Sequence, residues 1–322
     1  LDLGDEGGRV LAAAFDSSAA VAVQAKDEIV VEPFAYSSDA GTVGKIVQRD
    51  VVEDLDFLSV VFENGVVVNV KPTDFKEKQI LITAGFGEGE LTLEPDRSPL
   101  SWLADRAFNG GGLEAHSEDD LRRITAGKAV GVGFGSGPDA FSLGGATTRE
   151  DLLLQCELIC AYFSAPGWRE DGRVQTMRSL PLYFDGLAHQ HQGPLALEFL
   201  PALFSDDPRQ RHPELEQIEA CTMADVEGWL GPHLDEAPIE VSIVGDLDVD
   251  ETLDVAARTF GALPPRREWR GYDERRDMPA PLAGLQQRHE IETQIAKSLV
   301  MIVFPMPDGL DPLVRRRGQV LG

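Results

Sequence analysis

The chain has 322 residues, of which 43% are hydrophobic, so one large domain with additional segments is expected. The 55 acidic and 29 basic residues give a net charge of −26, which argues against nucleic acid and anionic membranes as partners because both require a basic surface. The sequence has no apolar run long enough to predict a membrane-spanning helix. Its three cysteines are too few for a disulfide framework.

The first 57 residues do not resemble a complete domain. Residues 10–25 are small and apolar, residues 27–36 alternate like an extended strand, and residues 37–44 are rich in turn formers. The start at Leu1 carries no signal peptide and looks like a cut in a longer chain. We therefore expect a linker with the tail of a preceding domain.

The first strong signal is SVVFENGVVVNV at residues 59–70. Two β-branched runs flank Asn64-Gly65, the dipeptide typical of a type I′ hairpin turn. Residues 79–86 predict a third strand, and residues 99–108 predict a helix with Ser98 as its cap and Pro99 at its first position. A short helix is expected at 118–124.

Strands at 129–134 and 140–145 are joined by a glycine-rich turn. This turn lacks the Gly-Lys-Ser/Thr ending of a phosphate-binding loop and leads into a strand, so a hairpin is favoured. A helix at 148–163 carries Cys156 and Cys160 one turn apart among leucines, which indicates core packing. Helices follow at about 169–188, 194–204 and 213–220.

Residues 223–265 predict a helix, a strand at 239–243, and a second helix that begins at Asp248 and stops at Gly261. A dinucleotide site is excluded because G-x-G-x-x-G is absent. The aspartates at 246, 248 and 250 imitate an EF-hand loop, but Glu251 and Ala257 occupy the positions that require Gly and Glu. After Pro265 a polar, basic stretch predicts a linker, and a new strand is expected near Thr293.

In order and spacing, these motifs resemble the M16 metallopeptidases, the family of insulinase, pitrilysin and mitochondrial processing peptidase. FENGVVVNVKPTDF is similar to the family's first hairpin, ITAGFG to the strand after it, and ELICAYFSAPGWRED to its Pro-terminated helix. EVSIVGDLDVDETLDVAARTFGALPP resembles the closing strand and helix of the module. The resemblance implies an α+β fold of two layers, a mostly antiparallel sheet packed by helices, as in LuxS/MPP-like metallohydrolases.

In that family the helix after the third strand carries H-x-x-E-H, in which two histidines bind Zn²⁺ and the glutamate activates water. The corresponding positions here hold Ser101, Ala104 and Asp105, and H-x-x-E-H occurs nowhere in the sequence. His116, His212, His233 and His289 are isolated, with no acidic or histidine partner at ligand spacing on one helix face. His189 and His191 lie beside Gly186 and Gly193 and indicate a polar loop or helix face. We therefore expect no catalytic, cofactor-binding or metal-binding residue in this chain.

The resemblance implies the zinc-free half of an M16-type zinc metallopeptidase. The expected domains are a linker and tail at 1–57, an M16-like domain without the zinc motif at 58–266, a linker at 267–290, and the start of the next such domain at 291–322. Zinc is expected in the other half, whether in the same chain or a partner subunit. The expected role is to enclose and bind peptide substrate without hydrolysing it, with an acidic wall that favours basic peptides.

An alternative is a non-peptidase core or adaptor subunit that uses the same fold as an assembly scaffold. A peptidase requires H-x-x-E-H in the preceding part of the chain or in a partner, whereas a scaffold does not. Neither nucleic acid nor membrane insertion is expected, and a periplasmic or secreted location is slightly favoured over a cytoplasmic one.

Overall fold

The computed structural model describes residues 7–21, 32–37, 43–271, 273–292, 297–304 and 312–321. The chain divides into two compact units, Leu1–Pro33 and Phe34–Gly322. The described part of the first unit contains the helix α1 (Gly7–Ala19), whose side chains are mostly exposed. Of the strand expected at 27–36, residues 27–31 lie outside the described residues and residues 32–36 form no strand.

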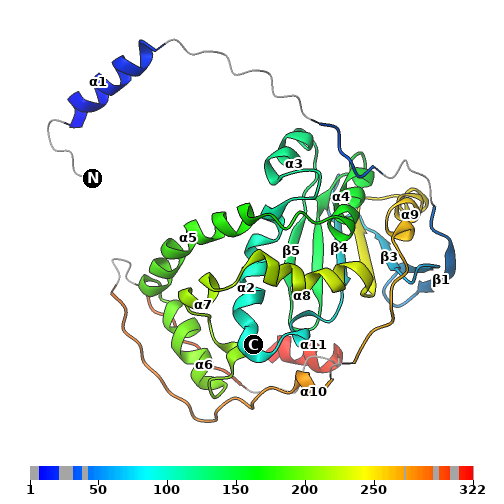
Figure 1. Ribbon diagram of the computed structural model, residues 1–322. Helices are drawn as coiled ribbons and strands as arrows, with labels where there is room; N and C mark the ends of the chain where they lie inside the picture. Colours follow the sequence, from blue (N-terminus) through cyan, green and yellow to red (C-terminus); the bar gives the residue numbers. More distant parts are fainter. Residues whose placement is uncertain are drawn as a thin grey trace. The chain divides into compact units, whose positions relative to one another are not determined.

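Within its described residues the second unit is built on a seven-stranded sheet with the order β1-β2-β3-β7-β4-β6-β5 (Figure 1). The strands are β1 (Ile46–Val52), β2 (Phe57–Phe62), β3 (Val67–Pro72), β4 (Ile80–Phe86), β5 (Gly133–Ser136), β6 (Phe141–Thr147) and β7 (Ile239–Gly245). All neighbours pair antiparallel except β3 and β7, which are parallel.

Helices of the second unit lie between β4 and β5, between β6 and β7, and after β7. They are α2 (Ser98–Ala107), α3 (Glu118–Ile124), α4 (Leu152–Ser164), α5 (Glu170–His189), α6 (Leu200–Leu203), α7 (Leu215–Glu219), α8 (Met223–Glu236), α9 (Val249–Arg258), α10 (Asp273–Arg276) and α11 (Pro312–Leu321). A π-helical turn, Leu195–Phe199, precedes α6. The helices expected from the sequence at 118–124, 169–188, 194–204 and 213–220 all form.

One face of the sheet holds the core. Side chains of β4 and β7 alternate between buried and exposed, as expected for strands covered on one side. The helices α2, α4 and α9 contact β5, β6 and β3 respectively, on the covered side (Figure 1). The core includes Phe62, Phe86, Phe141, Phe163 and Phe260, all fully buried. This is the two-layer α+β architecture that the sequence predicts.

The first hairpin forms, but its turn differs from the expected one. A type I′ turn needs a positive φ at both Asn64 and Gly65, and of these two residues only Gly65 has one, at 87°. The Gly65 amide donates to the carbonyl of Phe62, and the Phe62 amide donates to the carbonyl of Val66, both at 2.9 Å. The loop is therefore three residues long, a tight turn followed by a left-handed glycine.

The turn differs because the Asn64 side chain is used elsewhere. Its Nδ2 donates to the carbonyl oxygens of Phe260 and Leu263 at 2.9 and 3.0 Å, and its Oδ1 accepts from the Val66 amide at 3.1 Å. These bonds join the first hairpin to the segment just after the helix α9, 196 and 199 residues further along the chain.

The closing segment expected at 223–265 is confirmed as helix, strand and helix. Its strand β7 lies at the centre of the sheet, with Val241 opposite Val68 of β3 and Ala84 of β4. The helix α9 is capped as expected, since Asp248 Oδ1 accepts from the amides of Asp250 and Glu251 at 3.0 Å. The aspartates here act in the turn and the cap.

Three local expectations are corrected. The strand β1 lies inside the segment expected to be a linker and pairs with β2; its central residues are exposed on both sides, so hydrophobic periodicity could not reveal it. The helix α4 begins at Leu152, later than expected. The hydroxyl of Ser98 donates to the carbonyl of Pro208 at 3.2 Å and caps no helix.

Residues 267–271 and 273–290 run along the surface of the domain and are held there by hydrogen bonds. Arg275 donates to Glu94 at 2.7 Å, and Arg209 donates to the carbonyl oxygens of Arg275 and Asp277 at 3.0 Å. The Leu282 amide donates to the carbonyl of Leu203 at 2.8 Å. Of the strand expected near Thr293, residues 297–304 are exposed and form no strand, while residues 293–296 lie outside the described residues. An extended apolar segment becomes a strand only when another strand pairs with it.

Candidate functional site

The helix α2 stands where the family resemblance places the metal-binding helix. Its buried face carries Leu100, Leu103 and Ala107, and contacts the strand β5 and the helices α5 and α8. Ser101 and Ala104 are buried, whereas Asp105 one turn after Ser101 is exposed. The three positions thus lie where the buried core meets the protein surface, next to β5.

Ser101 and Asp105 belong to a hydrogen-bonded row of four side chains. The Ser101 hydroxyl donates to a carboxylate oxygen of Glu90 and lies 2.7 Å from the Ser136 hydroxyl of β5. Asp105 Oδ1 accepts from both the amide and the hydroxyl of Ser136, at 2.6 and 2.8 Å. The row connects the turn after β4, the helix α2 and the edge strand β5.

The row is complete only when it holds one additional proton. The three oxygen contacts, Glu90 to Ser101, Ser101 to Ser136 and Ser136 to Asp105, require three hydrogens, and two serine hydroxyls supply two. Burial and the nearby charge of Asp105 raise the pKa of Glu90, against the bond from Ser101. Desolvation also raises the pKa of Asp105, against its bonds from Ser136. Protonation of Glu90 would supply this hydrogen, because Glu90 would then donate to Ser101 and the Ser101 hydroxyl could donate to Ser136.

These residues do not fit a zinc ion. A catalytic zinc needs three protein ligands from His, Cys, Asp or Glu, and this helix presents a hydroxyl, a methyl group and one carboxylate. Asp105 Oδ1 already accepts two hydrogen bonds from Ser136. Across the described parts of the chain, no group of three or more His, Cys, Asp or Glu residues is arranged to hold a metal ion.

A second carboxylate, Glu88, is buried two residues before Glu90. Arg267 donates to its two oxygens at 2.7 Å each, and the Arg270 amide donates to one of them at 3.1 Å. Burial alone would raise the pKa of Glu88, but the Arg267 and Arg270 bonds and the Arg267 charge hold it below its ordinary value. This ion pair fixes the segment that leaves the domain after Pro265.

Several histidines have local contacts of their own. His233 Nδ1 is 3.6 Å from Glu88, and burial lowers its pKa; His289 pairs with Glu198 at 3.1 Å. His116 is buried, accepts from the Ala35 amide at 3.0 Å and stacks on Phe34. His189 and His191 are at the surface, at the end of α5 and just beyond it.

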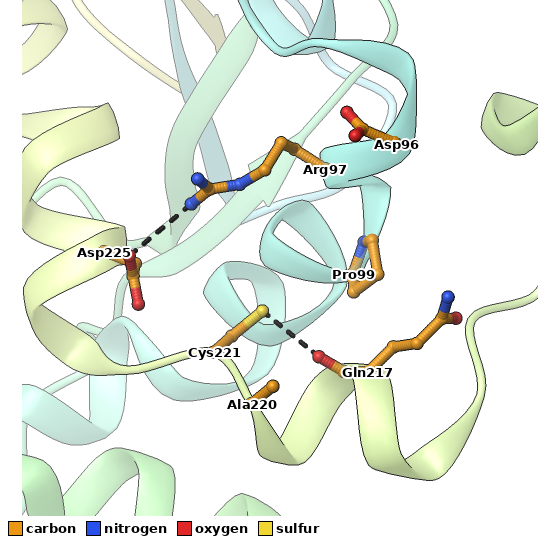
Figure 2. A pocket seen from close by; sticks show the side chains of 7 residues that line it. All are labelled: Asp96, Arg97, Pro99, Gln217, Ala220, Cys221 and Asp225. Carbon is orange, nitrogen blue, oxygen red and sulfur yellow. Dashed lines mark hydrogen bonds and ion pairs between the residues drawn. The ribbon is translucent and has the colours of Figure 1, made fainter.

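The three cysteines are thiols without catalytic surroundings. Cys156 and Cys160 are buried in α4, as expected for core packing, and burial raises the pKa of both. Cys221 lines an open pocket of about 280 Å³ beside the start of α2 (Figure 2). Its thiol donates to the Gln217 carbonyl at 3.4 Å, and partial burial raises its pKa. The pocket's Arg97 pairs with Asp225 at 3.5 Å, so this hollow presents no activated nucleophile.

Sequence reasoning placed Ser101 and Asp105 but missed Glu88, Glu90 and Ser136. The strand β5 brings Ser136 to α2 from 31 residues away, and Arg267 reaches Glu88 across 179 residues. The only local signal was the Gly-Glu-Gly-Glu sequence after β4, in which two acids follow a buried strand.

Comparison with known proteins gives a family match for part of the chain. Residues 221–315 match the family described as Peptidase M16 inactive domain. No curated protein matches the sequence. No helix in the described residues is both long and apolar enough to cross a membrane.

Several solved structures share the fold. The periplasmic protease PqqL from Escherichia coli is 18% identical with a TM-score of 0.62, over 80% of this chain and 28% of PqqL. The ferredoxin protease FusC, solved in complex with an Arabidopsis ferredoxin, is 18% identical with a TM-score of 0.59, over 82% of this chain and 29% of FusC. A peptidase M16 inactive domain from Pseudomonas fluorescens is 16% identical with a TM-score of 0.51, over 73% of this chain and 54% of that one.

The resemblance to the M16 metallopeptidases, and to their inactive C-terminal part, is thus confirmed. The fold class expected from the sequence is confirmed as well, since the helix-packed sheet matches these M16 proteins. The chain spans less than a third of the length of PqqL and FusC.

Proposed function

We propose that this chain is the zinc-free half, or a large part of it, of an M16-type zinc metallopeptidase. In this role it encloses and binds a peptide substrate while another half hydrolyses it. The match of residues 221–315 to an M16 inactive domain supports the assignment. The likeness of the fold to parts of PqqL, FusC and pitrilysin supports it further.

The observation that carries this proposal is the content of the helix α2. At the positions of the two family histidines and the glutamate it holds Ser101, Asp105 and Ala104, and the two polar side chains are tied to Glu90 and Ser136. A helix whose polar groups are already bonded internally is suited to a wall of the chamber. Catalysis then depends on a zinc-bearing partner half with H-x-x-E-H, in the same chain or in a second subunit.

PqqL is described as periplasmic and FusC was solved with a bound ferredoxin. By analogy we propose a periplasmic or secreted setting and a peptide or small protein as substrate. The excess of acidic residues favours basic substrate segments at long range.

The test uses the purified 322-residue chain together with the H-x-x-E-H-containing half that precedes it or is encoded beside it. With zinc and an unstructured peptide, the chain alone should show no cleavage, the zinc half alone should be slow, and the mixture should be faster. A zinc half in which the motif glutamate is replaced serves as the matched control. Chelator-sensitive cleavage by the pure chain alone contradicts the proposal.

The same experiment distinguishes the peptidase role from the alternative, an assembly scaffold. If no H-x-x-E-H sequence precedes Leu1 or occurs in a subunit that binds the chain, the scaffold role replaces the peptidase role. Stable binding to such a half without any gain in peptide affinity has the same consequence.

A further inference from the structure

An arginine and three aromatic rings gather on the outer side of α2. Trp102 and Arg106 lie one helical turn apart, and the Arg106 guanidinium stacks over the Trp102 ring, with its carbon 3.4 Å from the ring centroid. The Tyr183 ring of α5 lies 5.6 Å from the same guanidinium carbon and 5.7 Å from the Trp102 ring. His212 stacks on Tyr183 at 5.6 Å. We call Trp102, Arg106, Tyr183 and His212 the aromatic shelf.

The rings of the shelf are held in place. The Tyr183 hydroxyl and His212 Nε2 are 2.9 Å apart, and His212 Nδ1 is 2.9 Å from the Pro213 carbonyl. Because the carbonyl can only accept, His212 Nδ1 carries the hydrogen, and Nε2 of the neutral ring accepts from Tyr183. Burial lowers the pKa of His212, and the charge of Arg106 adds to this effect. The shelf is therefore preorganised, with Arg106 and Tyr183 open to solvent.

Arg106 has no carboxylate partner among the described residues, since none lies within 4.0 Å of its guanidinium. By contrast, Arg209 and Arg275 bind carboxylates at 2.6 and 2.7 Å. The adjacent Asp105 directs its Oδ1 to Ser136. Arg106 donates to the Trp102 carbonyl at 3.2 Å, which uses one of its five N–H groups.

Surrounding protein atoms desolvate the Arg106 guanidinium and lower its pKa. Tyr183 and the charge of Asp105 oppose this shift, but no described carboxylate is in ion-pair contact with Arg106. A carboxylate in direct contact would restore the stabilisation lost with the hydration. A planar guanidinium fixed against a ring presents its remaining donors in a fork that matches a carboxylate. Aromatic and arginine side chains in this combination are also enriched at protein interfaces.

We propose that the aromatic shelf binds the carboxylate of a glutamate or aspartate side chain in a peptide, with an adjacent apolar residue against Tyr183 and Trp102. The site is local, whereas the negative charge of the chain as a whole acts at longer range. Because salt at physiological strength screens charges beyond about 8 Å, the repulsion weakens while the contact with Arg106 persists. Binding of an acidic peptide should then hold or tighten when salt rises from low to physiological strength.

The experiment titrates the 322-residue chain with end-blocked peptides that have a single glutamate between leucines, or glutamine in its place. The side-chain NMR signals of Trp102 and Arg106 report contact at the shelf. The glutamate peptide should bind about tenfold tighter than the glutamine peptide. Arg106→Gln should abolish this difference, and Arg106→Lys should retain only part of it because the planar fork is lost.

Arg122→Gln, at an exposed arginine of α3 that already pairs with Glu118 and Asp119, is the matched control and should change nothing. Equal affinity for the two peptides overturns the proposal, as does full retention of the difference in Arg106→Gln. If a blocked-side-chain peptide with a free C-terminal carboxylate binds as tightly as the glutamate peptide, the assignment to an acidic side chain is wrong. Pairing with a zinc half is measured separately, so failure here leaves that role intact.

Discussion

Glu88 and Glu90 lie two residues apart in the turn after β4, and their surroundings shift their pKa values in opposite directions. Arg267 donates hydrogen bonds to both carboxylate oxygens of Glu88, and the pKa of Glu88 is lowered. The Glu90 carboxyl is bonded to the Ser101 hydroxyl, in a row that continues through Ser136 to Asp105, and the pKa of Glu90 is raised. Burial penalises both charges, so the partners decide the direction in which each pKa moves.

The two glutamates also have different structural roles. Glu88 fastens the departing segment to the domain through an ion pair, whereas Glu90 fills the position beside α2 without requiring a cation. The buried polar groups at this helix must be satisfied within the protein, and the serine row does so for Ser101.

Removing Arg267 should produce the largest effect. Arg267→Ala leaves Glu88 buried without its cation, and we expect the free energy of unfolding in urea to fall by about 3 kcal/mol at pH 7. Glu88→Gln combined with Arg267→Met should recover most of this loss. Arg288→Ala, which removes an exposed arginine paired with Glu290, is the control. A loss no larger than that of the control would show that the ion pair carries no stability.

Breaking the serine row should have an intermediate effect. Ser101→Ala removes the hydroxyl that connects Glu90 to Ser136, and we expect a loss of about 1.5 kcal/mol in the free energy of unfolding. Ser179→Ala is the matched control, because its hydroxyl bonds to the Thr176 carbonyl of its own helix. Equal stability of the two variants would mean that water replaces the row.

The smallest effect depends on pH and has opposite signs at the two glutamates. Because the pKa of Glu90 is raised in the fold, its contribution is complete below about pH 4.3, the ordinary glutamate value, and is lost as the pH rises through the folded-state value. Glu90→Gln imitates the protonated row and should stabilise the protein by about 1 kcal/mol at pH 8, with little change at pH 4.

For Glu88 the pKa is lowered, so its contribution is present above about pH 4.3 and disappears as the pH falls further. Glu88→Gln should therefore destabilise the protein most at pH 8. The exposed Glu114→Gln serves as the control for both curves. Parallel pH curves for Glu88→Gln and Glu90→Gln would refute the difference between the two carboxyls.

The sequence predicted those parts of the fold that depend on neighbours along the chain. The hairpin around Gly65, the helix α2 and the cap at Asp248 follow from local turn and helix chemistry. The strand β1 escaped prediction because an edge strand exposed on both faces lacks the alternation that marks a buried one.

The candidate site was predictable only in part. The spacing within α2 located Ser101 and Asp105, but not the side chains that bond to them. Ser136 and Glu90 reach α2 only when β5 and the turn after β4 have folded against it, and no local sequence pattern predicts such long-range contacts. The turn at Asn64 was missed for the same reason, since its side chain binds carbonyls near residue 260.

The position of β7 has a consequence for synthesis of the protein. Because β7 separates β3 from β4, the strands β1-β2-β3 and β4-β6-β5 form two half-sheets that cannot join until residue 245 has left the ribosome. During that interval both inner edges, β3 and β4, offer unpaired backbone groups to other chains. A product truncated before β7 would leave both of these edges unpaired, which makes it an aggregation hazard.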